Sequence, residues 1–380
     1  MNRRSLSETE RLDWLRLART HGVGPVTFAK LIERYGDADA AIDALPRLAA
    51  RGGRAKPLRP VSRDQARAEM ERLDALGARL LCACEPEFPA GLAVLDPPPP
   101  VISVMGPLEP GAQPACAIVG ARNASAVGLR FAGDLARQLG ERGVTIVSGL
   151  ARGIDGAAHA ASLETGTIAV IAGGLGRIYP PEHADLQHAI ARQGLVVSET
   201  TPDHVAQARD FPKRNRLIAG LSLGVVVVEA AERSGSLITA RLAAEQGREV
   251  MAVPGSPLDP RAKGANRLLR DGAALIESAD DVIAVLNNAR PPLLEEPGGH
   301  GYEDERSAPE SFDSEADRIR EEIAGLLSPT PVSRDELARI TRAPARAVLA
   351  ALIELELAGR CVLVPGGLVH AAYPDQSQPD

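Results

Sequence analysis

Aromatic residues are scarce in this chain of 380 residues: they make up 3 %, with a single tryptophan. The apolar residues, 44 % of the chain, are therefore biased toward alanine, valine and leucine. Together with abundant glycine, this composition suits parallel sheets covered by closely packed helices. The length exceeds that of one ordinary domain, so we expect two or three domains.

Cysteines and long apolar runs are also few. Of the four cysteines (Cys82, Cys84, Cys116 and Cys361), only the first two are close in sequence, and no second pair completes a zinc site. No run approaches the ~18 apolar residues of a membrane span, and no apolar leader follows the N-terminus. These absences predict a cytoplasmic protein without a membrane span or a metal site.

The net charge of −7 is unevenly distributed. Residues 291–317 hold nine acidic residues against one base, Arg306, and this net −8 leaves the remainder of the chain at +1. The acidic balance therefore does not exclude a polyanionic partner. Because residues 289–317 are also rich in proline and glycine, they are predicted to form an acidic disordered linker.

Helical patterns lie at both ends of the chain. Residues 1–78 are predicted to form a small helical domain, in which the turn Gly22-Val23-Gly24-Pro25 resembles that of a helix-hairpin-helix or SAM-like unit. Amides in such a turn can approach a nucleic-acid phosphate, and a plain glycine-capped turn is an equal alternative. The basic stretch from Arg47 to Arg63 is predicted to be mobile. Residues 318–380 show three helices and a hairpin, the pattern of a winged helix, which reads nucleic acid or binds protein.

Residues 79–288 alternate apolar strands with amphipathic helices. This order predicts the α/β class, with an extended Rossmann-like, doubly wound and mostly parallel sheet. Strands are expected near residues 116–119, 144–148, 168–172, 195–198, 225–229, 249–253 and 274–277. A ligand on such a sheet binds beyond the carboxyl ends of the strands, so the residues that follow each strand form the candidate site.

The segment from Ser148 to Asp155, which follows the second strand of this series, is the most informative one. Backbone amides at a glycine-rich turn from strand to helix can face an anion, and the helix dipole favours one there. Arg152 lies in this turn between Gly149 and Gly153. We therefore expect the turn to bind a phosphate or a nucleotide.

Loops after two other strands repeat this combination. Gly120, Ala121 and Arg122 follow the first strand, where the arginine can form two parallel hydrogen bonds with a phosphate. Gly174 follows the third strand in a glycine-rich loop that also carries Arg177. Both loops are predicted to border the same ligand.

The segment after the fourth strand combines positive charge with an aromatic ring. Its candidate residues are Phe211, Lys213, Arg214, Asn215 and Arg216. Cations that follow a backbone and a ring on which a base can stack are what single-stranded nucleic acid requires. Core packing of the ring and salt bridging of the two arginines are the alternatives.

Catalytic patterns are missing. The chain contains no G-x-S-x-G, no Walker lysine pattern and no H-E-x-x-H, and no acidic ribose-binding residue accompanies the glycine-rich loops. His159 is typical of a buried core histidine, and Glu229 is a conceivable general base without a nucleophile beside it. We therefore expect a binding protein with no catalytic residues, no metal and no cofactor.

The ordered runs Ile118–Arg122, Ser148–Asp155 and Phe211–Ser222 resemble the DNA-processing protein A family (DprA, also called Smf). The segment from Val253 to Gly255 and the segment from Gly264 to Ala273 are similar to the same family. The resemblance covers roughly residues 80–286, and the flanking helical domain and winged helix agree with the family's domain order more loosely.

This resemblance implies a non-enzymatic protein that binds and protects single-stranded DNA entering a bacterial cell. It also implies that the protein acts as a homodimer and helps load the recombinase RecA during natural transformation. Arg122 with the Gly120 turn would hold phosphates, and Phe211, Arg214 and Arg216 would line the same groove.

One segment departs from the family pattern. Glu182 and His183 stand where members often have a base and an asparagine. An acid at this position would oppose the strand, so we expect weaker binding at that edge.

Two other functions remain open on the sequence. One is a nucleotide-binding Rossmann-like enzyme that acts on a nucleoside monophosphate, with Glu229 as the catalytic acid or base. The other is a scaffold in which the winged helix alone binds DNA.

Overall fold

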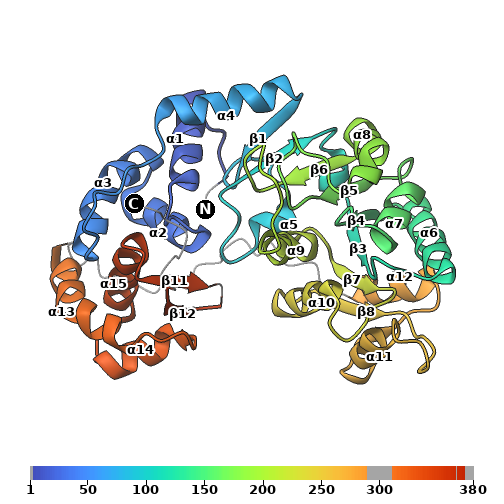
Figure 1. The fold of residues 1–380 in the computed structure, drawn as a ribbon. Helices are drawn as coiled ribbons and strands as arrows, with labels where there is room; N and C mark the ends of the chain where they lie inside the picture. Colours follow the sequence, from blue (N-terminus) through green and yellow to red (C-terminus); the bar gives the residue numbers. More distant parts are fainter. Residues whose placement is uncertain (1–2, 289–309, 365, 373–380) are drawn as a thin grey trace. The chain divides into compact units, whose positions relative to one another are not determined.

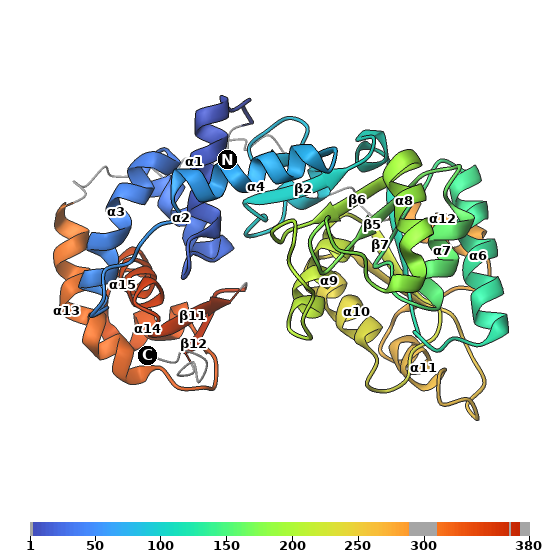
Figure 2. The same ribbon diagram turned by 45° about the horizontal axis from the view of Figure 1, so that its top comes forward.

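The computed structural model describes residues 3–288, 310–364 and 366–372 (Figures 1 and 2). These residues form two compact units. The first contains residues 3–5, 68–95 and 101–288, and the second contains residues 6–67, 96–100 and the described residues from 310 onward. The helical N-terminal domain and the C-terminal domain therefore belong to one unit.

The first unit is built on a nine-stranded sheet with the order β1-β2-β6-β5-β4-β3-β7-β8-β9. Its strands are β1 (Ala78–Cys82), β2 (Val101–Met105), β3 (Ala115–Val119), β4 (Thr145–Ser148), β5 (Thr167–Val170), β6 (Leu195–Ser198), β7 (Gly224–Val227), β8 (Glu249–Ala252) and β9 (Ala274–Leu275). Strands β3 to β9 pair in parallel, whereas β2 pairs antiparallel with β1 and β6. This confirms the predicted extended Rossmann-like α/β fold.

Helices cover both faces of this sheet (Figure 1). Helices α6 (Ala126–Glu141), α7 (Ile154–Ala161), α8 (Ala184–Gln193) and α12 (Ala279–Asn288) lie on one face, and α5 (Ala90–Ala93), α9 (Asp210–Gly220) and α10 (Gly235–Glu245) lie on the other. Helix α11 (Lys263–Arg270) packs beside β8, and α4 (Arg63–Ala75) precedes β1. Every residue of β3 to β7 is buried, which explains why these strands read as unbroken apolar runs.

Helix α9 begins at Asp210, so the predicted site segment from Phe211 to Arg216 lies within it. An acid in the first turn stabilises a helix N-terminus, and Pro212 is tolerated there. Phe211 and Lys213 therefore belong to the first turn of α9 and not to the preceding loop.

The second unit contains the N-terminal helices and the winged-helix domain, which has the expected three helices and a small sheet of order β10-β12-β11. Its elements are α1 (Glu8–Arg19), α2 (Pro25–Tyr35), α3 (Ala38–Arg51), α13 (Glu310–Leu326), β10 (Val332–Ser333), α14 (Arg334–Thr341), α15 (Ala345–Leu357), β11 (Cys361–Val364) and β12 (Leu368–Ala371). Since α13 begins at Glu310, residues 310–317 are helical and do not belong to the predicted linker; residues 289–309 lie outside the described part of the chain.

The four cysteines are buried as free thiols, and burial raises the pKa of Cys116 to about 12. Within the described ranges, no helix has the length and hydropathy needed to cross a bilayer. No group of three or more histidine, cysteine or acidic side chains among the same residues is placed to hold a metal ion.

His159 in α7 gives the first unit a defined response to acid. Burial, with the nearby charges of His183 and Arg214, lowers the pKa of His159 from 6.5 to about 3. The folded state therefore binds this proton less tightly than the unfolded state. The stability that the neutral His159 side chain contributes to the folded state is complete above pH 6.5 and is lost as the pH falls toward 3.

We expect the free energy of unfolding of the wild type to fall below pH 6.5 more steeply than that of His159→Gln, by about 1.4 kcal/mol per pH unit. Urea denaturation between pH 7.5 and 5 measures both slopes. His188→Gln, which changes an exposed histidine in α8, should keep the wild-type slope. Equal slopes for wild type and His159→Gln would contradict the assignment.

Candidate nucleic-acid interface

The predicted site residues come from loops at one edge of the sheet. Strands β3, β4, β5 and β6 are neighbours and run in parallel, so their carboxyl ends meet at the same edge. The loops after these strands lead into α6, α7, α8 and α9. The fold therefore brings together the four segments that the sequence singled out.

The turn after β4 does not offer the free amides that the sequence predicted. The amides of Gly149 and Ala151 donate to one carboxylate oxygen of Asp155, at 3.1 and 3.3 Å. Between them, Leu150 has a left-handed backbone with φ of 54°, and its carbonyl contacts Nδ1 of His183 at 3.1 Å. The protein's own carboxylate thus occupies the position at which an anion was expected.

A second internal carboxylate occupies the N-terminus of α6. Glu229, just after β7, accepts hydrogen bonds from the amide of Ser125 at 2.9 Å and from its hydroxyl at 2.6 Å. A β-carbon at Gly128 would overlap this carboxylate. Strand order reverses between β3 and β7, where a nucleotide phosphate usually binds in such folds. Glu229 therefore fills the usual nucleotide position and is held there by the helix.

Three segments meet at the ring of Phe211. The ring centroid of Tyr179, from the loop after β5, lies 5.9 Å from that of Phe211. The guanidinium carbons of Arg122 and Arg214 lie 5.1 and 6.0 Å from the Phe211 centroid. Arg122 and Tyr179 are exposed, and Phe211 is half-buried. We call these four residues the aromatic–arginine cluster.

Arg214 is the buried member of the aromatic–arginine cluster. It is 7 % exposed and donates to the carbonyls of Gly149 and Val170, which binds the ends of β4 and β5 to α9. Burial lowers its pKa to about 10; Asp155 opposes this shift and Arg122 adds to it. A β-carbon at Gly149 would overlap the guanidinium, which explains the glycine there. Arg214 therefore positions the loops and adds positive charge beneath Phe211.

Several other predicted site residues support the loops. The Ser148 hydroxyl donates to the Ile118 carbonyl at 2.6 Å, and the amide of Ile154 donates to Ala121 at 3.3 Å. Asn215 donates to the Gly235 carbonyl at 3.3 Å, and Arg216 forms an ion pair with Glu199. A β-carbon would overlap neighbouring atoms at each of three predicted glycines, Gly120, Gly153 and Gly174. Among the predicted site residues, Arg122, Arg152 and Lys213 are exposed, and Phe211 is half-buried, as are Ala121 and Arg216.

Tyr179 was not among the predicted site residues. It lies in a glycine-rich loop after a strand, which is the signal that could have identified it. Glu182, which follows in the same loop, forms an ion pair with Arg152. Its own backbone amide and Arg152 hold the pKa of Glu182 below its usual range. The acid that departs from the family pattern is thus paired with one of the exposed cations.

Comparison with protein families assigns all three domains. Residues 79–287 match the family described as DNA recombination-mediator protein A. Residues 8–71 match the DprA-like N-terminal HHH domain, and residues 305–367 match the DprA winged helix domain. The chain belongs to the DprA family. This confirms the resemblance drawn from the three sequence runs.

Known relatives support the assignment over different lengths. The chain is 31 % identical to Protein Smf of Synechocystis over 402 residues, which cover 95 % of this chain and 98 % of the relative. DprA from Streptococcus pneumoniae superposes with a TM-score of 0.61 at 34 % identity, covering 74 % of this chain and 98 % of that one. A Helicobacter pylori DprA structure, described for its single-stranded DNA binding mode, has a TM-score of 0.52 at 30 % identity and covers 56 % and 97 %.

The position of Glu229 predicts a structural role. Glu229→Gln keeps the size of the side chain but removes the charge that accepts from Ser125, so the free energy of unfolding should fall by about 1.5 kcal/mol. Urea denaturation measures this loss. Glu232→Gln, at an exposed position further along the same loop, should leave stability unchanged. Unchanged stability of Glu229→Gln, with loss of a nucleoside monophosphate hydrolase activity, would instead indicate a catalytic glutamate.

Proposed function

We propose that this DprA-family protein binds single-stranded DNA at the aromatic–arginine cluster. The observation that carries the proposal is the position of the half-buried Phe211 ring beside the exposed side chains of Tyr179 and Arg122. Rings allow unpaired bases to stack without sequence preference, while guanidinium groups neutralise the phosphates between them. Arg152 and Lys213 extend the positive charge on the same edge of the sheet.

The two internal carboxylates favour a polymer over a small nucleotide as the ligand. Glu229 and Asp155 already accept the amides at which a mononucleotide phosphate would be expected. An enzyme that acts on a mononucleotide would need those amides free to bind the phosphate, whereas a DNA strand can be held by exposed side chains instead. For this reason we prefer a binding protein over the enzyme that acts on a nucleoside monophosphate.

The cellular role follows from family membership. We infer that the protein acts in the cytoplasm as a homodimer, protects incoming single strands and helps load RecA during natural transformation or recombination. The central domain, residues 79–288, would carry DNA binding. The single-stranded DNA binding named for the Helicobacter pylori relative supports this inference.

Removing the exposed cation or ring should weaken DNA binding. Arg122→Ala should lower the affinity for a single-stranded oligonucleotide about tenfold and reduce the salt slope by about 0.7, because one phosphate contact is lost. Phe211→Leu should cost about 1–3 kcal/mol of binding through lost stacking. Fluorescence anisotropy at two salt concentrations measures both changes.

The control for these variants is Arg137→Ala. Arg137 is half-exposed near the end of α6, at the opposite edge of the sheet, and pairs with Glu141 at 2.9 Å. The Arg137→Ala variant should bind the single-stranded oligonucleotide like the wild type. Thermal unfolding checks that all variants are folded. Wild-type affinity of Arg122→Ala would disprove the site.

Removing the acid next to Arg152 should have the opposite effect. Glu182→Gln releases Arg152 from its ion pair and removes a charge that repels phosphate. We expect affinity for single strands to rise about threefold, with a steeper dependence on salt. The double variant Glu182→Gln with Arg152→Ala should lose this gain. If Glu182→Gln bound more weakly than the wild type, the acid would not oppose the strand.

A further inference from the structure

Two elements of the second unit have the form of DNA-binding elements. One is the turn between α1 and α2, Gly22 to Pro25, and the other is α15, the second helix of a helix-turn-helix with α14. In the structure the turn, which is half-buried, lies against the C-terminal end of α15. Helix α15 packs on α3, and α2 packs on β11.

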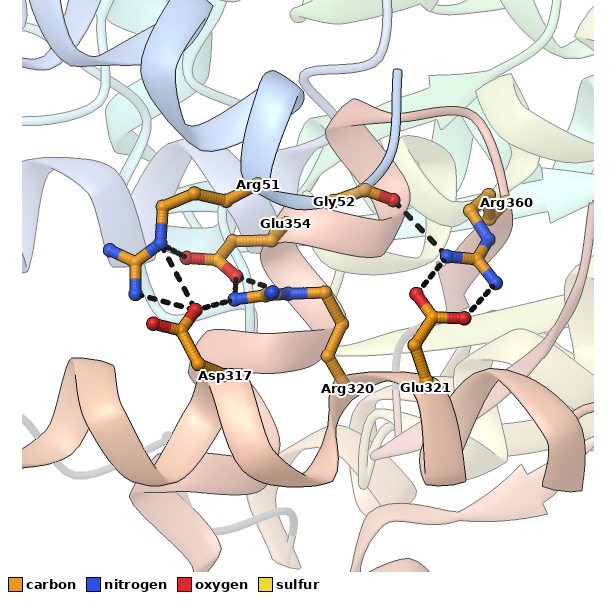
Figure 3. A network of polar contacts seen from close by, with 7 residues as sticks. All are labelled: Arg51, Gly52, Asp317, Arg320, Glu321, Glu354 and Arg360. Atoms are coloured by element: carbon orange, nitrogen blue, oxygen red, sulfur yellow. Dashed lines mark hydrogen bonds and ion pairs between the residues drawn. The ribbon is translucent and has the colours of Figure 1, made fainter. Parts of the chain in front are cut away.

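A buried charge network joins α3 to the winged-helix domain (Figure 3). Glu354 of α15 is fully buried and lies 3.3 Å from Nε of Arg51 and 2.7 Å from Nε of Arg320. Arg51 also pairs with Asp317 of α13 at 2.9 Å. Burial raises the pKa of Glu354, although the two arginines oppose the shift. A buried carboxylate of this kind is tolerated because both arginines are present.

Backbone contacts continue this interface. A β-carbon at Gly52, just after α3, would overlap the backbone carbonyl of Glu354. The backbones of these two segments are therefore in direct contact. Arg54 donates to the Leu357 carbonyl at 3.0 Å, and Arg360 donates to the Gly52 carbonyl at 3.4 Å. The stretch from Arg47 to Arg63, which was predicted to be mobile, thus contains the last turn of α3 and the residues Gly52 and Arg54 that contact the winged-helix domain.

The hairpin turn itself lies over the C-terminal end of α15. A β-carbon at Gly22 would be 3.6 Å from the Glu356 carbonyl oxygen, and one at Gly24 would be 3.9 Å from the Glu356 carboxylate. The hydroxyl of Thr27 donates to that carboxylate, and Val26 packs against the core of the winged-helix domain. The carboxylate and the negative end of the helix dipole would repel a phosphate here.

Helix α15 lacks the character of a DNA-reading helix. Arg346 is the basic residue in its sequence, whereas Glu354 and Glu356 point into the interface with the N-terminal helices. Reading a base edge requires a helix face open to the major groove and side chains that donate to bases or phosphates. The face of α15 that would do this is covered along its second half.

We propose that α15 of the winged-helix domain is a docking surface whose partner is the N-terminal helical domain of the same chain. Docking masks the hairpin turn Gly22 to Pro25 from DNA and commits the C-terminal end of α15 to protein contact. While the two domains are docked, the hairpin turn does not contact DNA. This assignment goes beyond the proposed function, which places single-strand binding in the first unit.

Gly52→Ala is the sharpest test. The backbone of Gly52 has φ of −68°, which alanine adopts readily, so the N-terminal domain should tolerate the change by itself. Its β-carbon would nevertheless overlap Glu354 in the docked state. Gly325→Ala in α13 is the matched control, because a β-carbon there meets open space. Arg51→Glu, which places a third acid beside Glu354 and Asp317, is an independent second variant.

Hydrogen exchange of the full chain reports docking directly. Protection of residues 22–27 and 350–357 should fall at least tenfold in Gly52→Ala and in Arg51→Glu, and should be unchanged in Gly325→Ala. Unchanged protection in both interface variants would overturn the docked arrangement.

A measurement of DNA affinity tests whether docking masks the hairpin turn. In an Arg122→Ala background, Gly52→Ala should raise affinity for an oligonucleotide duplex at least fivefold, and Gly325→Ala should not. Loss of protection without a gain in DNA binding would show that docking does not mask a DNA-binding turn. Because the comparison is made within the Arg122→Ala background, its outcome does not depend on whether Arg122 itself binds DNA.

Discussion

The carboxylate of Asp155 determines what the loop edge of the sheet can bind. By accepting the amides of Gly149 and Ala151, it holds Leu150 in a left-handed conformation that a leucine rarely adopts. The charge of Asp155 is balanced in turn by Arg214, which holds the ends of β4 and β5. Because these two amides are already used, an anion at this turn depends more on side chains. Under the proposed function, this favours a flexible polymer over a small nucleotide.

Glu229 applies the same constraint at the other half of the sheet. In a doubly wound fold, the N-terminus of the helix after the switch point is the strongest anion site that the backbone offers. Here it is neutralised by the chain's own carboxylate, which the Gly128 backbone accommodates. Under the proposed function, recognition depends on the exposed Arg122 and on the rings of Phe211 and Tyr179, which suit a strand better than a single phosphate. Glycine-rich loops thus occur here together with internal carboxylates at two of the positions where a nucleotide phosphate would be expected.

The sequence predicted the sheet well because β3 to β7 are buried on both faces, and burial of this kind leaves an unbroken apolar run in the sequence. It also predicted that these loops meet at one edge of the sheet, since their place follows from strand order. It could not predict which way their polar groups face. The acceptor role of Asp155 depends on the Leu150 conformation, which no residue pattern indicates. Likewise, Arg214 and Arg122 look equivalent in sequence, but only the tertiary structure shows that one is buried and the other exposed.

The contact between α3 and α15 is the hardest of all to foresee from sequence. Its partners lie about three hundred positions apart, and each domain has its own plausible binding surface when considered alone. What distinguishes the docked arrangement is a pair of buried acids, Glu354 and Glu356, on a helix expected to meet DNA. A buried carboxylate is costly unless basic or hydroxyl partners reach it, and here Arg51 and Thr27 of the N-terminal helices supply part of that compensation beside Arg320 of the winged-helix domain itself. The same rule operates in the central sheet, where Arg214 and Asp155 are buried together. In both units, the charges that the fold encloses are therefore not available to a ligand at the surface.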